Sequence, residues 1–207
     1  VLTEDRQESV RLARLLDSHN VDRRTEQNRI LEEATEAVLS RGPLENAAIV
    51  ASNFGWHPGV IGIVAGKLVE RFRRPSFVVS IDKDGLARGS ARSVMGFNLA
   101  GAIDATREFL LSGGGHEMAA GFSLSSANLE AFTEAIVKYS SKTLRPEDCL
   151  PLYVIDATIE GIDATEEATA DLARLEPFGQ ANPEPLFATR AARITSLTPT
   201  RNAEHAK

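Results

Sequence analysis

Residues 113–124 read Gly-Gly-Gly-His-Glu-Met-Ala-Ala-Gly-Phe-Ser-Leu, and this stretch carries more information about fold and chemistry than any other part of the 207-residue chain. Three consecutive glycines let a backbone adopt positive φ and approach a ligand closely. Their N–H groups can form a concavity that binds anions. His116 follows at once and can donate to a phosphate or titrate near neutral pH. The composition predicts a phosphate cradle with His116 at its lip, but alone it fits a flexible surface turn equally well.

A second polar motif lies upstream, where residues 88–93 read Arg-Gly-Ser-Ala-Arg-Ser. On a strand, Ser90 and Arg92 would point to the same face. The fork of a guanidinium group matches the geometry of a phosphate, and a serine adds a neutral donor. The motif therefore predicts a clamp for a phosphodiester. An exposed strand with charged outer positions is the simpler alternative, and the motif taken alone favours it.

The distribution of charge indicates where such a ligand would bind. The net charge of −6 is not that of a generic nucleic-acid-binding protein. Residues 1–40 carry nine acids and six bases, residues 41–148 carry eleven acids and twelve bases, and residues 149–207 carry nine acids and five bases. Only the middle segment is weakly basic, and it contains both polar motifs. We expect a phosphate ligand there.

Cysteine usage and hydropathy indicate the cellular compartment. The single cysteine, Cys149, excludes an internal disulfide framework and fits a reducing cytoplasm. The sequence has no apolar run of the roughly 18 residues that a membrane span needs. Residues 1–6 lack the basic and apolar regions of a signal peptide. We therefore expect a cytoplasmic protein that does not bind membranes.

The order of elements predicts an α/β fold. Residues 3–39 have the period of a charged helix, for which we expect Thr3 as the N-cap and a break at Asn20–Asp22. Strands and helices then alternate over residues 44–147, which is typical of an α/β domain. Within it we expect strands near 47–51, 77–81, 86–91 and 120–124, and helices near 59–72, 98–110 and 127–139. Two further strands, 152–159 and 186–197, flank a short helix that begins at Thr165.

The helix near residues 59–72 begins with a motif of its own. Gly59, Gly62 and Gly66 would share one side of this helix and permit close packing on a sheet. Trp56 and His57 at its entrance could stack on a base or line an interface, although a structural role for Trp56 is favoured.

Metal and nucleophile motifs are not apparent. The four histidines are widely spaced, and with one cysteine the sequence offers no zinc site. Two-metal phosphoryl chemistry needs converging carboxylates and histidines, and the sequence shows no such cluster. The Gly-x-Ser-x-Gly elbow of serine hydrolases also does not occur. We therefore expect this chain to bind no metal.

Several of these motifs together resemble a known family. Gly113–Ser123 resembles the signature of the DHHA1 domain, the partner domain of DHH-type phosphoesterases. Trp56–Ala65, Gly89–Ser93 and Gly96–Leu99 are similar to segments of the RecJ family, which are 5′→3′ exonucleases specific for single-stranded DNA. The proline-rich loop Leu175–Phe187 is similar to the RecJ segment that leads into an OB-type domain, and this loop discriminates RecJ from other DHHA1 proteins.

The resemblance implies a fold and a domain organisation. We expect a connector helix over residues 1–42 and a DHHA1-type domain over 43–147, with a mixed central sheet flanked by helices. The start of an OB-type β domain would follow over 148–207. In this family a DHH domain holds two Mn²⁺ or Mg²⁺ ions, and it precedes the connector helix. The chain would then be a fragment without that domain, inactive by itself.

The resemblance also implies a division of labour. The metals of the parent enzyme would hydrolyse the phosphodiester, and this chain would hold single-stranded DNA. His116 would assist catalysis from the phosphate side by stabilising developing charge. The residues expected to contact substrate are Ser90, Arg92, Ser93, Gly113, Gly114, Gly115 and His116. Further expected partners are single-strand-binding protein and other proteins of DNA repair and recombination.

Two alternative functions stay open. The chain could be the DHHA1 module of a phosphodiesterase for small oligonucleotides or cyclic dinucleotides. It could also be a non-enzymatic module that docks to a repair protein, an alternative suggested by the acidic flanks and the solvated first helix.

Overall fold

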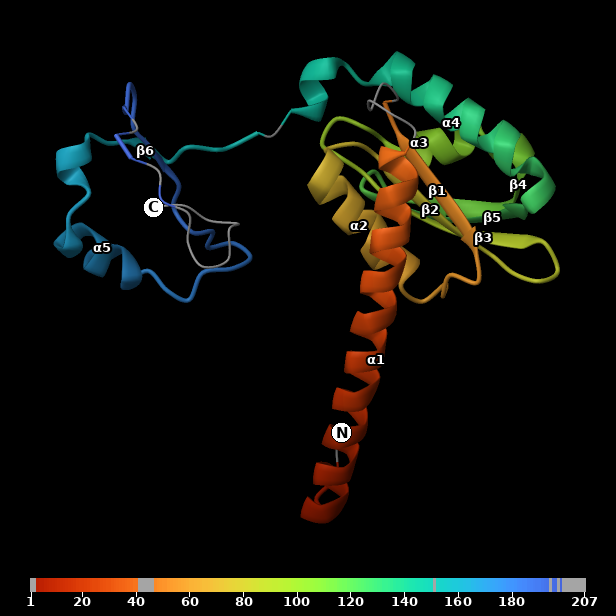
Figure 1. The fold of residues 1–207 in the computed structure, drawn as a ribbon, viewed down its shortest axis with the longest axis horizontal. Helices are drawn as coiled ribbons and strands as arrows, with labels where there is room; N and C mark the ends of the chain where they lie inside the picture. Colours follow the sequence, from red (N-terminus) through yellow and green to blue (C-terminus); the bar gives the residue numbers. More distant parts are fainter. Residues whose placement is uncertain (1–2, 41–46, 151, 194, 197, 199–207) are drawn as a thin grey trace. The chain divides into compact units, whose positions relative to one another are not determined.

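A computed structural model describes residues 3–40, 47–150, 152–193, 195, 196 and 198. The chain divides into two compact units, Val1–Leu150 and Pro151–Lys207, and each is described by itself. Figure 1 shows the first unit as one long helix and a sheet with helices on both faces. None of the described helices is both long enough and apolar enough to cross a bilayer.

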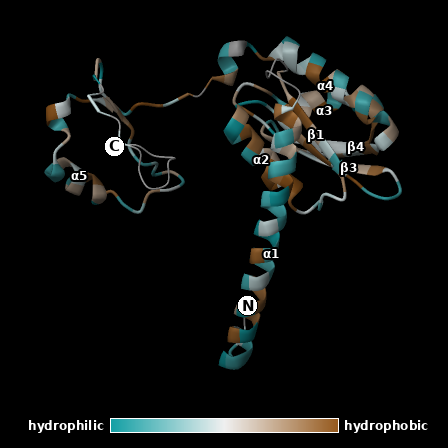
Figure 2. Ribbon diagram, in the orientation of Figure 1, coloured by the Kyte–Doolittle hydropathy of each residue, from teal (hydrophilic) through white to brown (hydrophobic). Residues whose placement is uncertain are grey.

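The first unit begins with α1 (Arg6–Leu39), a single unbroken helix. Its N-cap is Asp5, which accepts hydrogen bonds from the backbone N–H groups of the first turn, so the prediction that Thr3 caps the helix is wrong. The break expected at Asn20–Asp22 does not occur. Arg23 donates to Asn20 and Gln27 across neighbouring turns, and such pairs stabilise a helix where propensity is low. Figure 2 shows mostly hydrophilic residues along this helix.

The sheet is mixed, as expected, and has the strand order β1-β2-β3-β5-β4. β1 (Ile49–Phe54) and β2 (Ser76–Ile81) are parallel, and α2 (Ile61–Phe72) connects them. The other neighbours are antiparallel. These strands are β3 (Leu86–Arg92), β4 (Leu110–Gly115) and β5 (Ala119–Ser125).

Each face of the sheet has its own core. Helices α3 (Leu99–Ala105) and α4 (Leu129–Thr143) cover one face, where Phe77, Phe122 and Phe132 make mutual ring contacts. Helices α1 and α2 pack on the opposite face, where Val78 contributes to a second cluster. Side chains alternate between the two faces because a strand has a period of two. Short 3₁₀ turns complete this unit at Arg107–Phe109, Ser126–Asn128 and Pro146–Cys149.

The glycine run does not form the expected loop with positive φ. Gly113–Gly115 is the end of β4, an extended edge strand, whereas the glycines with positive φ are Gly55, Gly85 and Gly96. The helix expected to reach Leu110 ends at Ala105 instead. Gly113 and Gly115 serve close packing in the strand, and a Cβ on Gly115 would lie 2.3 Å from the Ala119 carbonyl oxygen.

The second unit contains little regular structure. Its strands β6 (Ala157–Thr158) and β7 (Phe187–Ala188) are parallel and much shorter than the expected 152–159 and 186–197. Between them lie a 3₁₀ turn, Gly161–Asp163, and α5 (Glu166–Ala173), which Thr165 caps as predicted. Residues 194 and 197 of the second expected strand lie outside the described residues.

Candidate nucleic-acid interface

One part of the sheet is polar and uncovered, on the face that carries α1 and α2. In β3, Ala87 and Ala91 point into the core formed with α3 and α4, so Arg88, Ser90 and Arg92 point to the opposite face. Helix α2 packs on β2 and β3, while β5 and β4 extend beyond it. We call this surface the open face; its residues are Arg88, Ser90, Arg92, Ser112, Gly114, Gly121 and Ser123.

The open face contains a hollow of about 390 Å³. Pro58 and Ile61, at the entrance to α2, line it together with residues of β3, β4 and β5. Gly121 lies opposite both Ser90 and Gly114 in the strand register. A Cβ built on Gly121 or Gly114 meets no described atom within 4 Å. At Gly121 the floor of the hollow is therefore bare backbone that a ligand can approach closely.

Ser90 lines the hollow, and Arg92 lies beside it on the same strand. The Arg92 Nη1 donates to the Ser90 hydroxyl at 3.3 Å and to the Ala91 carbonyl at 2.8 Å. A Cβ on Gly62 would lie 2.9 Å from the Ser90 oxygen and 3.2 Å from Arg92 Nη2. The helix can approach this pair so closely only because residue 62 is glycine. The pairing predicted from the spacing of these two residues is present, with a guanidinium and a hydroxyl on one face.

The N-terminus of α2 lies beside Ser90 and Arg92 and adds an electrostatic field that favours anions. Val60 is its N-cap, and no side chain of the described residues caps the first turn. Uncapped N–H groups and the helix dipole make such a terminus attractive to anions. Gly62, in this turn, faces Ser90 and Arg92. A guanidinium, a hydroxyl and the first turn of α2 thus lie next to one another here.

His116 lies in the turn between β4 and β5, at the same end of the sheet as Arg92. Its N–H donates to the carbonyl of Ala119, which is the register partner of Arg92. Ser93 and Leu99 donate backbone N–H groups to the carbonyls of this turn, and these bonds fix its position. His116 is exposed to solvent. The histidine is therefore available at the edge of the open face.

The structure does not bring all the expected substrate contacts together. Ser93 is buried, and its hydroxyl donates to the Phe97 carbonyl at 2.7 Å. A Cβ on Gly113 would meet Ile103 and Phe122, so that glycine faces the core, as does Gly115 by alternation. Ser93, Gly113 and Gly115 therefore serve packing here, while Ser90, Arg92, Gly114 and His116 are at or beside the open face.

Sequence reasoning missed Ser112, Gly121 and Ser123. The alternation of residues 119–125 contains the signal, because Phe122 and Leu124 are buried and their neighbours must face the other way. Ser112 was hidden because the preceding residues were expected to be helical and the glycines to form a loop.

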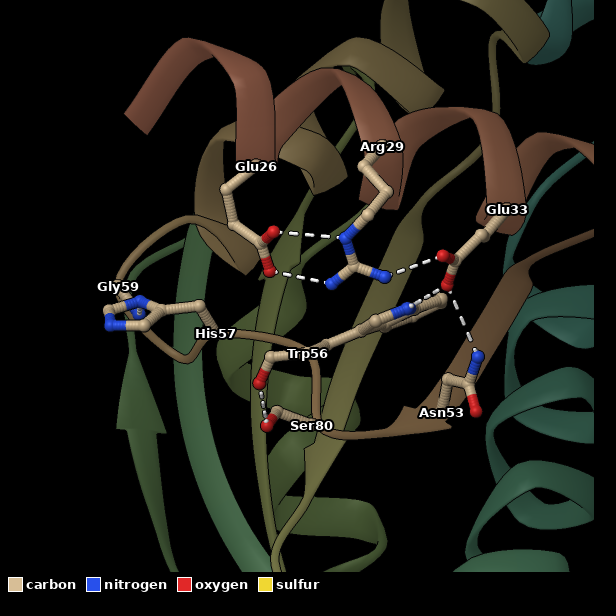
Figure 3. Close-up of polar contacts among 8 residues, drawn as sticks. All are labelled: Glu26, Arg29, Glu33, Asn53, Trp56, His57, Gly59 and Ser80. Atoms are coloured by element: carbon tan, nitrogen blue, oxygen red, sulfur yellow. Dashed lines mark hydrogen bonds and ion pairs between the residues drawn. The ribbon is translucent and has the colours of Figure 1, made fainter. Parts of the chain in front are cut away.

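A separate polar cluster anchors the loop between β1 and α2 to α1 (Figure 3). The buried Trp56 donates its Nε1–H to Glu33 at 2.7 Å, and Asn53 donates to the same carboxylate at 3.3 Å. Arg29 bridges Glu33 and Glu26. The hydrogen bond from Trp56 lowers the pKa of Glu33, and the one from Arg29 lowers the pKa of Glu26.

This cluster gives Trp56 a structural role. Its carbonyl accepts a hydrogen bond from Ser80, and the neighbouring His57 accepts one at Nδ1 from the Gly59 N–H. These bonds hold the loop whose Pro58 lines the hollow. Trp56 is therefore packed against α1 and is not available to stack on a base.

The described residues contain no group of three or more histidine, cysteine, aspartate or glutamate side chains that could hold a metal ion. The part of the chain that the structure describes therefore does not fit the two-metal centre of a DHH-type phosphoesterase. The open face is suited to binding and orienting a phosphate.

Two family models match the chain. The model of the DHHA1 domain matches residues 45–142, which include the whole sheet, and the model of the RecJ OB domain matches residues 155–207. The chain belongs to the RecJ family. The mixed sheet and the two matched domains are those expected from the sequence.

RecJ relatives align with most of the chain. The "Single-stranded-DNA-specific exonuclease RecJ" of Bacillus subtilis is 40% identical over 186 residues, 89% of this chain and 24% of the relative. The Thermus thermophilus RecJ is 34% identical over 188 residues, 90% of this chain and 26% of the relative. The chain thus spans about a quarter of the length of these RecJ proteins.

Solved structures of RecJ also match most of this chain. The crystal structure of Thermus thermophilus RecJ in complex with Mg²⁺ has a TM-score of 0.77 and 32% identity, and covers 90% of this chain and 28% of that one. Its complex with Mn²⁺ has the same TM-score at 31% identity, and covers 94% of this chain and 29% of that one. The RecJ relatives have therefore been solved with the divalent ions that the sequence resemblance implies for the parent enzyme.

Proposed function

We propose that this chain is the part of a 5′→3′ single-strand-specific DNA exonuclease that holds its substrate. The open face would bind backbone phosphates of single-stranded DNA. The convergence of Ser90, Arg92 and the uncapped N-terminus of α2 carries this proposal. His116 would contact a phosphate at the edge of the same face.

The proposal divides the chain into a connector helix (1–42), a substrate-binding DHHA1 domain (43–147) and the start of an OB-type domain (148–207). Hydrolysis would be carried out by metal ions of the parent enzyme, held by residues outside the described part of this chain. The chain alone is therefore proposed to bind without cutting. Its setting would be DNA repair or recombination in the cytoplasm, with single-stranded DNA as the main partner.

The charge of the chain limits the affinity to be expected. A net charge of −6 opposes approach to DNA, so binding should depend on a few local contacts. The logarithm of the affinity for single strands falls with the logarithm of the salt concentration, and the slope is proportional to the number of phosphates contacted. Binding should therefore be measured at low salt and repeated as salt increases.

Fluorescence anisotropy with a labelled oligothymidylate tests the proposal. Arg92→Gln should weaken binding roughly tenfold, because it removes a charge-assisted contact. Lys138→Gln is the matched control, since Lys138 is exposed on α4, on the opposite face of the sheet. Equal affinity of the Arg92→Gln and Lys138→Gln variants would contradict the assignment.

A further inference from the structure

We propose that the open face holds a second phosphate subsite, formed by Arg88, Ser112 and Ser123, for another phosphate of the strand bound at Arg92. The proposal rests on the proposed function and extends it along the sheet. Arg88 and both serines line the hollow of about 390 Å³. With this subsite, the open face would bind two phosphates of the same DNA strand.

The three residues form a row across three strands. Ser123 is the register partner of Arg88 on one side and of Ser112 on the other. Residues directly opposite in antiparallel strands point to the same face, so the three side chains are neighbours. The two hydroxyl oxygens are 2.7 Å apart. One hydroxyl donates to the other, which leaves the second hydroxyl proton free to donate to a phosphate oxygen.

Arg88 makes only a weak ion pair within the protein. Its Nη1 lies 3.3 Å from Asp82 Oδ2, and both side chains are partly exposed. Exposed ion pairs of this kind contribute little to stability. The other carboxylate oxygen, Oδ1, accepts the backbone N–H groups of Asp84 and Leu86 and so holds the turn. A phosphate could therefore replace Oδ2 as the partner of Arg88 without disturbing that turn.

The spacing of the two subsites suits a short length of a single strand. Arg88 and Arg92 are four residues apart on β3, which corresponds to roughly 13 Å along a strand. No more than about four nucleotides span this distance, even in a stacked strand. The row between the two subsites contains Ser90, Gly121 and Gly114. Because two of these residues have no side chain, a sugar-phosphate backbone can lie low between the arginines.

Two substitutions with opposite expected effects test the subsite. Arg88→Gln should weaken binding of a labelled oligothymidylate roughly fivefold. It should also reduce the slope of log affinity against log salt by about 0.7, because one phosphate contact is lost. Asp82→Asn keeps an oxygen for the turn but removes the charge that competes for Arg88, so it should strengthen binding roughly twofold. Lys138→Gln is again the control.

The outcomes separate this proposal from the proposed function. Loss of affinity in both Arg88→Gln and Asp82→Asn would mean that the ion pair supports the fold, and would overturn the subsite. An Arg88→Gln variant equal to Lys138→Gln, with Arg92→Gln still impaired, would overturn the subsite and leave the proposed function standing. Failure of the unsubstituted chain to bind the oligonucleotide would overturn both.

Discussion

At the scale of single residues, glycine serves two opposite purposes in this chain. Gly121 and Gly114 leave space on the open face, since a Cβ at either position meets no described atom within 4 Å. Gly115 occupies a position with no room for a side chain, because a Cβ there would lie 2.3 Å from a backbone oxygen and 2.5 Å from the Ala120 Cα. Substitution by alanine should therefore have different consequences at Gly121 and Gly115.

Gly121→Ala should reduce DNA binding without loss of stability. Gly121 does not have positive φ, so alanine is compatible with its backbone and should raise the free energy of unfolding by about 0.5 to 1 kcal/mol. The new methyl group would rise from the floor of the hollow and keep a DNA backbone away. Denaturant unfolding and anisotropy on the same preparation measure both effects. Unchanged affinity would show that DNA does not reach this floor.

Gly115→Ala supplies the contrast. Its methyl group would collide with the backbone of β5, which cannot move without breaking the hairpin. The free energy of unfolding should fall by about 1 to 3 kcal/mol, as for other overpacking substitutions. Denaturant unfolding measures it, and a Gly115→Ala variant as stable as Gly121→Ala would show that the hairpin relaxes freely.

The sequence predicts some of these residues better than others. Ser90 and Arg92 could be placed on one face because a period of two is a property of any strand. Ser93 could not be separated from them, because its burial depends on the chain turning inward to Phe97 just after β3 ends. That turn is set by tertiary packing and has no local signal.

At the scale of elements, the loop between β1 and α2 depends on one buried ring. Trp56→Phe removes the donor to Glu33 and should lower the free energy of unfolding by about 1 to 2 kcal/mol near neutral pH. The expected loss is modest because the Glu33 side chain is about a third exposed. Thermal or denaturant unfolding of the variant and the unsubstituted chain measures the difference.

The difference should depend on pH. The hydrogen bond from Trp56 lowers the pKa of Glu33 from its ordinary value of 4.5. A carboxylate with a depressed folded-state pKa contributes stability above the unfolded value, and this contribution disappears as pH falls through the folded value. The loss of stability in Trp56→Phe should therefore be full at neutral pH and shrink as the pH falls below the ordinary value of 4.5. A loss of unfolding free energy that is the same at neutral and at acidic pH would mean that the Trp56 ring contributes only by packing.

The glycine run shows how an element can be misassigned. Three glycines have no intrinsic preference for a strand, and local propensity favours a loop. The register with β5 makes them a strand, because Gly113, Gly114 and Gly115 pair with Phe122, Gly121 and Ala120. On its other side, the Phe122 ring packs over Gly89 of β3, where a Cβ would lie 2.1 Å from the ring. Pairing with the neighbouring strand β5 decides this element, whereas α2 and α4 could be found from their own periodicity.

At the scale of the whole molecule, the stabilising core is confined to the first unit. Every described residue that is buried lies between Ile30 and Leu144. In the second unit, the described residues are all exposed or only partly buried, and large apolar side chains such as Leu152, Tyr153 and Ile162 are exposed. Burial of apolar surface is the main source of folding free energy. The cooperative unfolding of this chain should therefore be that of residues 1–150.

A chain shortened to residues 1–150 tests this expectation. Both core clusters and the open face would be retained, since all their residues precede Leu150. The unfolding midpoint should stay within about 2 °C of that of the full chain, because the removed residues bury little. Arg92→Gln should still weaken binding of the oligothymidylate in the shortened chain. A midpoint lower by more than about 5 °C would show that residues 151–207 stabilise the first unit. Loss of the Arg92 effect would show that the open face needs them to bind DNA.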